Sequence, residues 1–356
     1  MPPLAIVRLA RATVMQQLQL EEALLRSTQR SWFVVGWDPR GGGDGDGDGE
    51  EGTALSALAP RPSPSSALHG RPPPPPFAPG DGDGGDDDEP PTIVLGISGK
   101  PSELIDLPLC VSQGPFNERG DSEARATAVR RFSGGGTVVV GRGTVLASLV
   151  ASREDLERRG VGAFPGPLMR WTAKVYARAF EGKDEEEEEA GEAAEENGGE
   201  EERERAGARP GPPPPSLFAL KENDYCVGDR KIAGNAQAIT GGRALHHTSF
   251  LWDWRDAHMR LLLPPRRQPD YRRRRAHGGF LARVRERWPR AFPRPEDLAL
   301  ALEGAVAEEW GGDVEEADVG ELRAALGGNH LRGNRRVDLG REWQKMAAAS
   351  KGGAGD

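Results

Sequence analysis

Hydrophobic and polar positions along the chain predict a mixture of helices and strands. Apolar side chains recur at helical spacing, for example at Met15, Leu18 and Leu25, which places them on one face of a helix. This spacing predicts helices over residues 13–27, 167–180, 295–309 and 315–326. Short apolar runs, typical of buried strands, occupy residues 32–37, 92–99, 137–140, 144–151 and 244–252. The alternation of the two kinds of segment indicates a mixed α/β or α+β domain.

Two low-complexity blocks interrupt these patterned segments. Residues 41–90 hold 11 acidic and 2 basic side chains, and residues 181–215 hold 14 acidic and 4 basic side chains. The whole chain has a formal net charge of −9, so the 271 residues outside the two blocks carry +10. Such blocks bury too little apolar surface to fold. We therefore expect disordered acidic inserts at 41–90 and 183–215 within a basic domain over residues 1–290.

Residue usage excludes several classes of protein. The sequence has no run of 18 or more apolar residues, so we expect no transmembrane helix. The 2 cysteines, Cys110 and Cys226, are too few for a disulfide framework or a cysteine-based zinc site, which indicates a reducing compartment. The first 20 residues contain two arginines and no acid, a weak resemblance to a transit peptide. The expected location is therefore the mitochondrion or the cytoplasm.

A glycine triplet precedes the strand predicted at 137–140. The block over 130–138 reads RRFSGGGTV. Consecutive glycines let the backbone approach a ligand and present N–H groups to an anion, and Arg131 adds a forked donor suited to phosphate or carboxylate. The block is not a P-loop, because no Gly-Lys-Ser/Thr follows, and its glycines do not have the spacing of a GxGxxG motif. The glycines alone leave a simple turn with a solvated arginine pair as an equal alternative.

Two further blocks carry polar side chains, and the second of them lies on a predicted strand. The first reads ENDY, then RKIAGNAQ, and its Lys231 could hold a carboxylate and a phosphate together, although an isolated lysine is usually a solvated surface charge. The second, HHTSFLWD, begins with His246 and His247. Neighbouring residues of a strand point to opposite faces, so these histidines are poor partners for one metal ion. We expect one to face the core or a site, and we expect no metal bound by protein ligands alone.

In this order, the blocks RRFSGGGTV, ENDY…RKIAGNAQ and HHTSFL resemble the catalytic domain of the lipoate-protein ligase A family, a biotin/lipoate protein ligase domain. They are most similar to its eukaryotic branch, in which the lysine loop continues as GNAQ and the histidine pair as HHTSFLWD. The resemblance covers residues 4–37, 92–151 and 217–287. It implies an α+β fold like the class II aminoacyl-tRNA synthetase and biotin synthetase core, with a mixed, mainly antiparallel sheet flanked by helices.

The resemblance also implies an ATP-dependent reaction in two steps. Lipoate first attacks the α-phosphate of ATP to give lipoyl-AMP and pyrophosphate, and a lysine of a lipoyl domain then takes the lipoyl group. The implied cofactors are ATP, lipoate and Mg²⁺. The implied acceptors are the lipoyl domains of 2-oxoacid dehydrogenase acyltransferase subunits and the glycine-cleavage H protein.

The same resemblance assigns roles to individual residues. Lys231 matches the family's essential lysine, which lies between the lipoyl carbonyl and the α-phosphate. Asn223 and Asp224 match an Asn-Asp pair that we place on the nucleotide–magnesium side. The expected binding residues are Arg131, Ser133, Gly134, Gly135, Gly136, Thr137, Val138, Val139, Asn223, Asp224, Gly234, Asn235 and His247.

Other functions of the same fold stay open. Lipoyl or octanoyl transferases use a cysteine upstream of the lysine, where this chain has Ser216, and Cys226 is only five residues before Lys231. Biotin–protein ligases carry a different glycine loop, and their lysine motif does not continue as GNAQ. A non-catalytic lipoate-binding protein would have no need of Arg131 and Lys231. We therefore favour a ligase over these three alternatives.

The positive charge concentrates at residues 264–290, which hold ten arginines and two acids. Within this run, YRRRRAHGGFL resembles a later helix of the family. Such a cluster can mark a nucleic-acid surface, but it lacks aromatic residues interleaved at stacking spacing and the acidic inserts would repel phosphate, so we do not expect nucleic acid as a partner. A solvated helix face and a docking surface for an acidic lipoyl domain are the remaining interpretations.

The last 65 residues are too few for the accessory domain that bacterial lipoate ligases often carry. We expect a short helical extension over 291–340 and a disordered tail over 341–356. Without an accessory domain, the protein could need a partner or could act mainly from preformed lipoyl-AMP.

Overall fold

The computed structural model describes residues 3–39, 90–111, 126–183, 218–327, 331 and 333–352. The expected acidic inserts lie almost entirely outside these residues, and so does Ser216.

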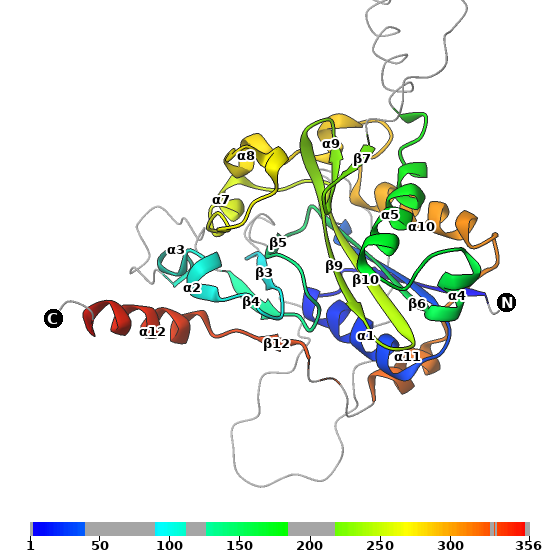
Figure 1. Ribbon diagram of the computed structural model, residues 1–356, viewed down its shortest axis with the longest axis horizontal. Helices are drawn as coiled ribbons and strands as arrows, with labels where there is room; N and C mark the ends of the chain where they lie inside the picture. Colours follow the sequence, from blue (N-terminus) through cyan, green and yellow to red (C-terminus); the bar gives the residue numbers. More distant parts are fainter. Residues whose placement is uncertain are drawn as a thin grey trace, which may run out of the picture.

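A large sheet of eight strands forms the centre of the described structure (Figure 1). In spatial order its strands are β11 (Val314–Glu316), β1 (Leu4–Ala10), β2 (Trp32–Trp37), β6 (Thr144–Ser152), β10 (Arg243–Leu251), β9 (Arg230–Ile239), β8 (Asp224–Val227) and β7 (Phe218–Lys221). The pairs β11–β1 and β1–β2 are parallel, and the other five pairs are antiparallel. The expected mixed, mainly antiparallel sheet is thus confirmed.

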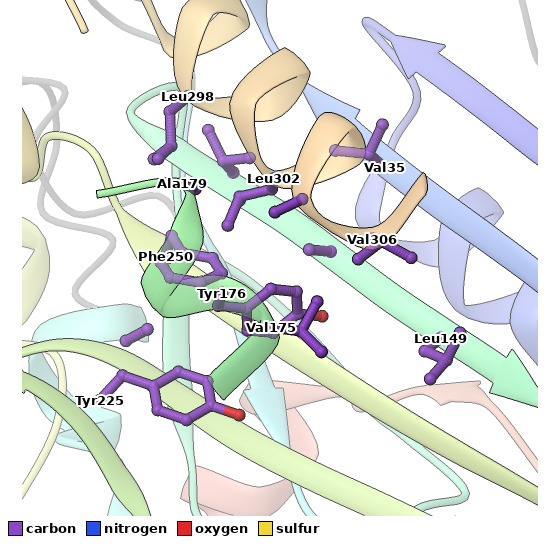
Figure 2. Close-up of a cluster of buried hydrophobic side chains, with 14 of the residues drawn as sticks. Val35, Leu149, Val175, Tyr176, Ala179, Tyr225, Phe250, Leu298, Leu302 and Val306 are labelled. Atoms are coloured by element: carbon purple, nitrogen blue, oxygen red, sulfur yellow. The ribbon is translucent and has the colours of Figure 1, made fainter. Parts of the chain in front are cut away.

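Helices cover both faces of this sheet. The strands alternate their side chains, so Phe33 and Val35 face one layer while Trp32 and Val34 face the other. The first layer contains α5 (Pro165–Arg178) and α10 (Pro295–Glu309), which lie side by side in Figure 1. The second contains α1 (Val14–Ser27) and α11 (Val319–Leu326). Figure 2 shows how side chains from α5, α10 and the sheet meet in the first layer.

A smaller sheet lies on the other side of α1. Its strands, in spatial order, are β12 (Arg335–Arg336), β4 (Thr127–Arg130), β3 (Thr92–Leu95) and β5 (Val138–Val140). Leu18 of α1 packs against Val94, Val129 and Val140 of this sheet. Short helices surround it: α2 (Pro101–Leu104), α3 (Leu107–Val111), α7 (Asp256–Met259) and α8 (His277–Phe280). Helix α1, which begins with a capping box at Thr13, therefore packs against both sheets.

The end of the chain differs from the expectation of an extension and a tail. Helix α10 packs in the core under the large sheet, and Val314 of β11 pairs with Leu4 of β1. Residues 339–352, which we expected largely in a disordered tail, form helix α12 (Leu339–Gly352). Its Leu339 joins the core of the small sheet, where Trp343 and Met346 also pack. Leu339, Trp343 and Met346 stand at the helical spacing i, i+4 and i+7, so the sequence contained the signal for this helix and the expectation of a tail was wrong.

The arginine run also differs from the single helix that its resemblance suggested. It forms a 3₁₀ turn, η3 (Asp270–Arg272), then α8 and α9 (Val284–Arg287). The backbone turns at Arg273 and Arg274, which have φ of 49° and 57°, in the left-handed region that ends a right-handed helix. In the described part of the chain, no helix has the length and apolar character needed to cross a membrane.

The placement of α10 in the core can be tested by mutation. Leu302 is fully buried between α10 and the sheet, whereas Leu300 on the same helix is 44% exposed. Leu302→Ala should lower the free energy of unfolding by about 2–5 kcal/mol, because it leaves a cavity. Leu300→Ala, the matched control, should change it by less than about 0.5 kcal/mol. Urea unfolding measures both; equal small effects would mean that α10 is a peripheral extension.

Candidate functional site

The predicted site residues gather around one cavity between the two sheets. Its volume is about 1030 Å³, and its walls come from α1, the glycine-rich loop, β8, β9, β10 and the arginine run. All the expected site residues line it except Ser133. Ser133 is buried directly behind the wall, with its hydroxyl 3.2 Å from Nε2 of His247. Three blocks that are far apart in the sequence thus form one site.

The glycine-rich loop, residues 133–137, approaches β3 and β9 closely. Gly135 has φ of 101°, and a Cβ there would lie 2.8 Å from Nη2 of Arg131 and 3.0 Å from Cβ of Ala236. A Cβ at Gly96, just after β3, would lie within 2.2 Å of the carbonyl oxygen of Gly135. Both positions therefore require glycine. The loop also donates a hydrogen bond from the Gly134 amide to the Gln237 carbonyl.

The two arginines before this loop bind backbone carbonyls. Arg131 is buried, and its guanidinium donates to the carbonyls of Gly134, Gly136 and Val94. Burial lowers the pKa of Arg131 to about 10, partly offset by the nearby Glu21 carboxylate. Arg130 donates to the carbonyls that follow β3. The sequence predicted that Arg131 donates hydrogen bonds to a ligand. In the structure, most of its N–H groups instead donate to backbone carbonyls and hold the loop.

Lys231 forms an ion pair at the floor of the cavity. Its Nζ lies 2.7 Å from Oδ1 of Asp224, and both side chains are largely buried. The other oxygen, Oδ2 of Asp224, accepts a hydrogen bond of 2.8 Å from the Tyr271 hydroxyl. A Cβ at Gly234 would lie 3.2 Å from Nζ of Lys231, so this glycine leaves room for the ammonium group. The lysine is therefore fixed rather than solvated, unlike the usual surface lysine.

A chain of hydrogen bonds joins the other polar residues of β8, β9 and β10. The Asn235 carboxamide donates to the Asn223 carbonyl and accepts from the Thr248 hydroxyl at 2.7 Å. Behind it, the amide of Gln237 donates to Nδ1 of His246, so the proton of that imidazole is on Nε2. Nε2 then faces the hydroxyls of Thr248, Tyr225 and Thr172. This chain orients Asn235 towards the cavity.

His246 and His247 have different environments, as their alternation on a strand predicted. His246 is fully buried, and burial lowers its pKa to about 3, with a further contribution from His247. His247 lines the cavity, and its Nδ1 lies 2.9 Å from Oε2 of Glu21. Glu21 is itself buried and also accepts from the Ser148 hydroxyl. His247 thereby connects α1 to Ser133 of the glycine-rich loop.

Cys226 is a buried thiol rather than an exposed nucleophile. Its side chain is inaccessible, and its sulfur lies 3.3 Å from the Tyr271 hydroxyl. Burial raises the pKa of the Cys226 thiol, partly offset by this hydrogen bond. A thiol with a raised pKa is a poor nucleophile. This supports the interpretation of Cys226 as a structural residue.

The arginine run contributes side chains both to the cavity and to the fold. Arg267 and the buried Arg272 line the cavity, and Arg272 lies over the ring of Phe280. Arg275 pairs with Asp229, while Arg283 and Arg285 pair with Asp253. The run is therefore not a uniformly solvated helix face.

One end of the cavity is apolar. Val14 and Leu18 of α1, Val94 of β3, Val138 and Val140 of β5 and Leu146 of β6 line it. On the opposite side are Leu251, Met259, Leu262, Leu263 and Phe280.

The hydroxyl of Thr137 on the glycine-rich loop is buried and has no hydrogen-bond partner among the described residues. Among the same residues, no group of three or more His, Cys, Asp or Glu side chains is arranged to hold a metal ion.

Comparison with protein families identifies the domain. Residues 88–286, more than half of the chain, match the model of the lipoyl protein ligase A/B catalytic domain. The chain belongs to this family. The match contains the glycine-rich loop, Lys231 and the histidine pair, whose geometry is described above.

Individual relatives are distant. A Plasmodium falciparum protein named inactive lipoate–protein ligase 2 is 23% identical over 205 residues, which are 54% of this chain and 47% of the relative. The chain thus spans about half the length of that relative. A lipoate-protein ligase A solved with ATP has 16% identity and a TM-score of 0.50, with 91% of this chain and 92% of that chain covered. A bipartite lipoate protein ligase of Thermoplasma acidophilum, studied with its E2 lipoyl domain, has 14% identity, a TM-score of 0.48 and coverage of 94% and 97%.

Several residues of the site were not predicted from the sequence. Glu21 lies three residues after Leu18, on the buried face of α1, and an acid on an apolar face was a usable signal. Gln237 stood in the quoted GNAQ block without an assigned role, and its bond to His246 follows from the pairing of β9 with β10. Tyr271 gave no such signal, because its contact joins segments far apart in the chain. Asn334, which contacts the residue before Ser133, lies in a part of the chain that we had expected to be peripheral.

The neutral state of His246 predicts a pH dependence of stability. The pKa of His246 is about 3 in the folded protein against an ordinary 6.5, so the unfolded chain binds this proton first as the pH falls. The free energy of unfolding should therefore decrease below about pH 6.5, with a limiting slope of about 1.4 kcal/mol per pH unit from this residue. Urea unfolding between about pH 5 and 7 measures it. His246→Gln should have a flatter profile than the wild type, and equal slopes would contradict the assignment.

Proposed function

We propose that the protein is an ATP-dependent lipoate–protein ligase that forms lipoyl-AMP and transfers the lipoyl group to a lysine of a lipoyl domain. The observation that carries this proposal is the largely buried Lys231 ammonium group, paired with Asp224, in the same cavity as the glycine-rich loop. Both reactants of the first step, a carboxylate and an α-phosphate, are anions. Their reaction needs charge neutralisation and alignment more than it needs a protein nucleophile.

Lys231 is suited to this task because it is oriented before any ligand arrives. Asp224 and Tyr271 fix the position of Nζ, and Gly234 leaves free space beside it. A fixed positive charge stabilises negative charge that develops in the transition state without reorganisation during the reaction. The Thr137 hydroxyl, which lacks a partner among the described residues, adds a polar group on the facing loop.

The cavity suits two ligands of different character. A volume of about 1030 Å³ is at the upper end of the range of about 300–1000 Å³ for sites that hold one drug-sized ligand. The apolar end around Leu18, Val138 and Leu146 suits a carbon chain with a dithiolane ring. Arg267 and Arg272 in the wall suit a polyanion such as ATP.

Magnesium fits this site only together with the nucleotide. Asp224 is the carboxylate beside Lys231, and magnesium is commonly held by one or two carboxylates together with phosphate oxygens. Asp224 and the phosphates would hold the ion, which neutralises phosphate charge when bound. The neighbouring Asn223 also lines the cavity, and its backbone carbonyl accepts a hydrogen bond from the side chain of Asn235.

The acceptors we propose are the lipoyl domains of 2-oxoacid dehydrogenase acyltransferase subunits and the H protein. The family description and the lipoyl domain named with a similar structure support this class of partner. The name of the Plasmodium relative favours one rival, a protein of this fold without ligase activity. The intact ion pair of Lys231 argues for activity, since a lysine with no reaction to serve would have no reason to stay buried and paired.

Replacing Lys231 tests the proposed chemistry. Lys231→Ala should reduce lipoate-dependent pyrophosphate release from ATP by at least about 10²–10³-fold, the effect of removing one donor that stabilises a developing charge. Lys174→Ala removes an exposed lysine of α5 and should leave the rate unchanged. Pyrophosphate release by Lys231→Ala at nearly the wild-type rate would refute the assigned role.

A further inference from the structure

The C-terminal segment contacts the glycine-rich loop directly. Gly333 and Asn334 lie between α1 and Phe132, the residue that precedes Ser133. The Phe132 amide donates a hydrogen bond of 3.1 Å to Oδ1 of Asn334. The amide nitrogen of the same side chain donates to the Leu18 carbonyl at 2.8 Å and to Oε2 of Glu22 at 2.9 Å. One carboxamide thus joins the loop to helix α1.

The contact is buried and tightly fitted. Asn334 is 8% exposed and Glu22 is fully buried. A Cβ at Gly333 would lie 2.4 Å from Cβ of Phe132 and 2.6 Å from Oε1 of Glu22, so a side chain does not fit. The amides of Gly333 and Asn334 both donate to the Glu22 carboxylate. Buried carboxylates need such partners, so α1 and the C-terminal segment depend on each other.

The segment continues along the small sheet. Arg335 and Arg336 of β12 pair with Arg130 and Val129 of β4, the strand that leads into the loop. Helix α12 then packs through Leu339 on the core of the same sheet. Figure 1 shows β12 and α12 running along the small sheet beside β4. The segment is therefore also fixed on the C-terminal side of its contact with Phe132.

We propose that Asn334 is a positioning residue that fixes the start of the glycine-rich loop, so that the C-terminal segment belongs to the ligand-binding apparatus. Phe132 lies between Arg131, which binds the carbonyls of Gly134 and Gly136, and Ser133, which contacts His247. Fixing the Phe132 amide therefore limits the movement of residues on both sides. The ligands named in this inference rest on the proposed function. The role of Asn334 in fixing the loop does not.

Removing the Asn334 carboxamide should loosen the loop and weaken ligand binding. In the full chain, Asn334→Ala leaves the Phe132 amide without this acceptor. Hydrogen exchange of the peptide covering 129–137 should become faster without ligand, and the dissociation constants for ATP and lipoate should rise about tenfold or more, because small displacements of binding groups have large effects. Exchange is read by mass spectrometry and affinity by calorimetry.

Two further variants separate positioning from general destabilisation. Leu302→Ala removes a fully buried side chain of α10, which lies in the other helix layer and whose apolar cluster does not include Phe132; it should lower the melting temperature without changing exchange at 129–137 or ligand affinity. Asn334→Ser keeps the backbone bonds from the segment to Glu22 but is too short to reach both Phe132 and Leu18. It should show the same loop-specific changes in a milder form if Asn334→Ala fails to fold.

The outcomes are distinct. Unchanged exchange at 129–137 in the Asn334 variants overturns the proposal, and so does an equal increase of exchange there in Leu302→Ala. Faster exchange confined to the Asn334 variants supports it. If the wild-type protein binds neither ATP nor lipoate, the proposed function fails, while the exchange comparison still decides the role of Asn334.

Discussion

Two neighbouring carboxylates buried in one helix organise this structure. Glu21 and Glu22 of α1 are essentially inaccessible, and each needs hydrogen-bond donors because an unpaired buried charge is costly. Glu21 obtains its partners from His247 and Ser148 of the large sheet. Glu22 obtains its partners from Arg26 and from the amides of Gly333 and Asn334. Removing one partner of a buried charge costs about 3–5 kcal/mol. Helix α1 therefore stabilises the positions of both sheets and of the C-terminal segment around the site.

These ties explain how a short glycine-rich loop can form a defined binding surface. Glycine residues alone would leave it free to move, since they restrict the backbone least. Here the loop is fixed by the Arg131 guanidinium, by the contact of Ser133 with His247 and by the acceptor that Asn334 presents to Phe132. The loop faces Lys231, whose ammonium is held by Asp224. In the function we propose, this preformed cavity receives the anionic carboxylate and phosphate groups.

Much of the fold followed from local patterns, and the site followed from motifs. Apolar periodicity identified α1, α5, α10 and the strands β2, β3, β5, β6 and β10, because a helix face or a strand face is a local property of the sequence. It did not identify the polar strands β8 and β9 in the cavity wall. The motifs predicted that the glycine-rich loop, Lys231 and His247 belong to one site, and all three line the same cavity. What local patterns could not show were contacts across long separations, such as Tyr271 with Asp224 or Asn334 with Phe132. The helix after residue 338 was missed although Leu339, Trp343 and Met346 stand at helical spacing, because the Gly, Ala and Lys residues of the last part of the chain indicated a disordered tail.

The most direct test of the central claim uses the wild-type protein with its proposed substrates. The protein is incubated with ATP, Mg²⁺, lipoate and an apo H protein, and the acceptor lysine is analysed by mass spectrometry. In parallel reactions octanoate or biotin replaces lipoate, and preformed lipoyl-AMP replaces ATP and lipoate. A ligase gives a lipoyl adduct that requires both ATP and lipoate. If the adduct forms only from preformed lipoyl-AMP, or does not form at all, the protein is not an ATP-dependent lipoate ligase.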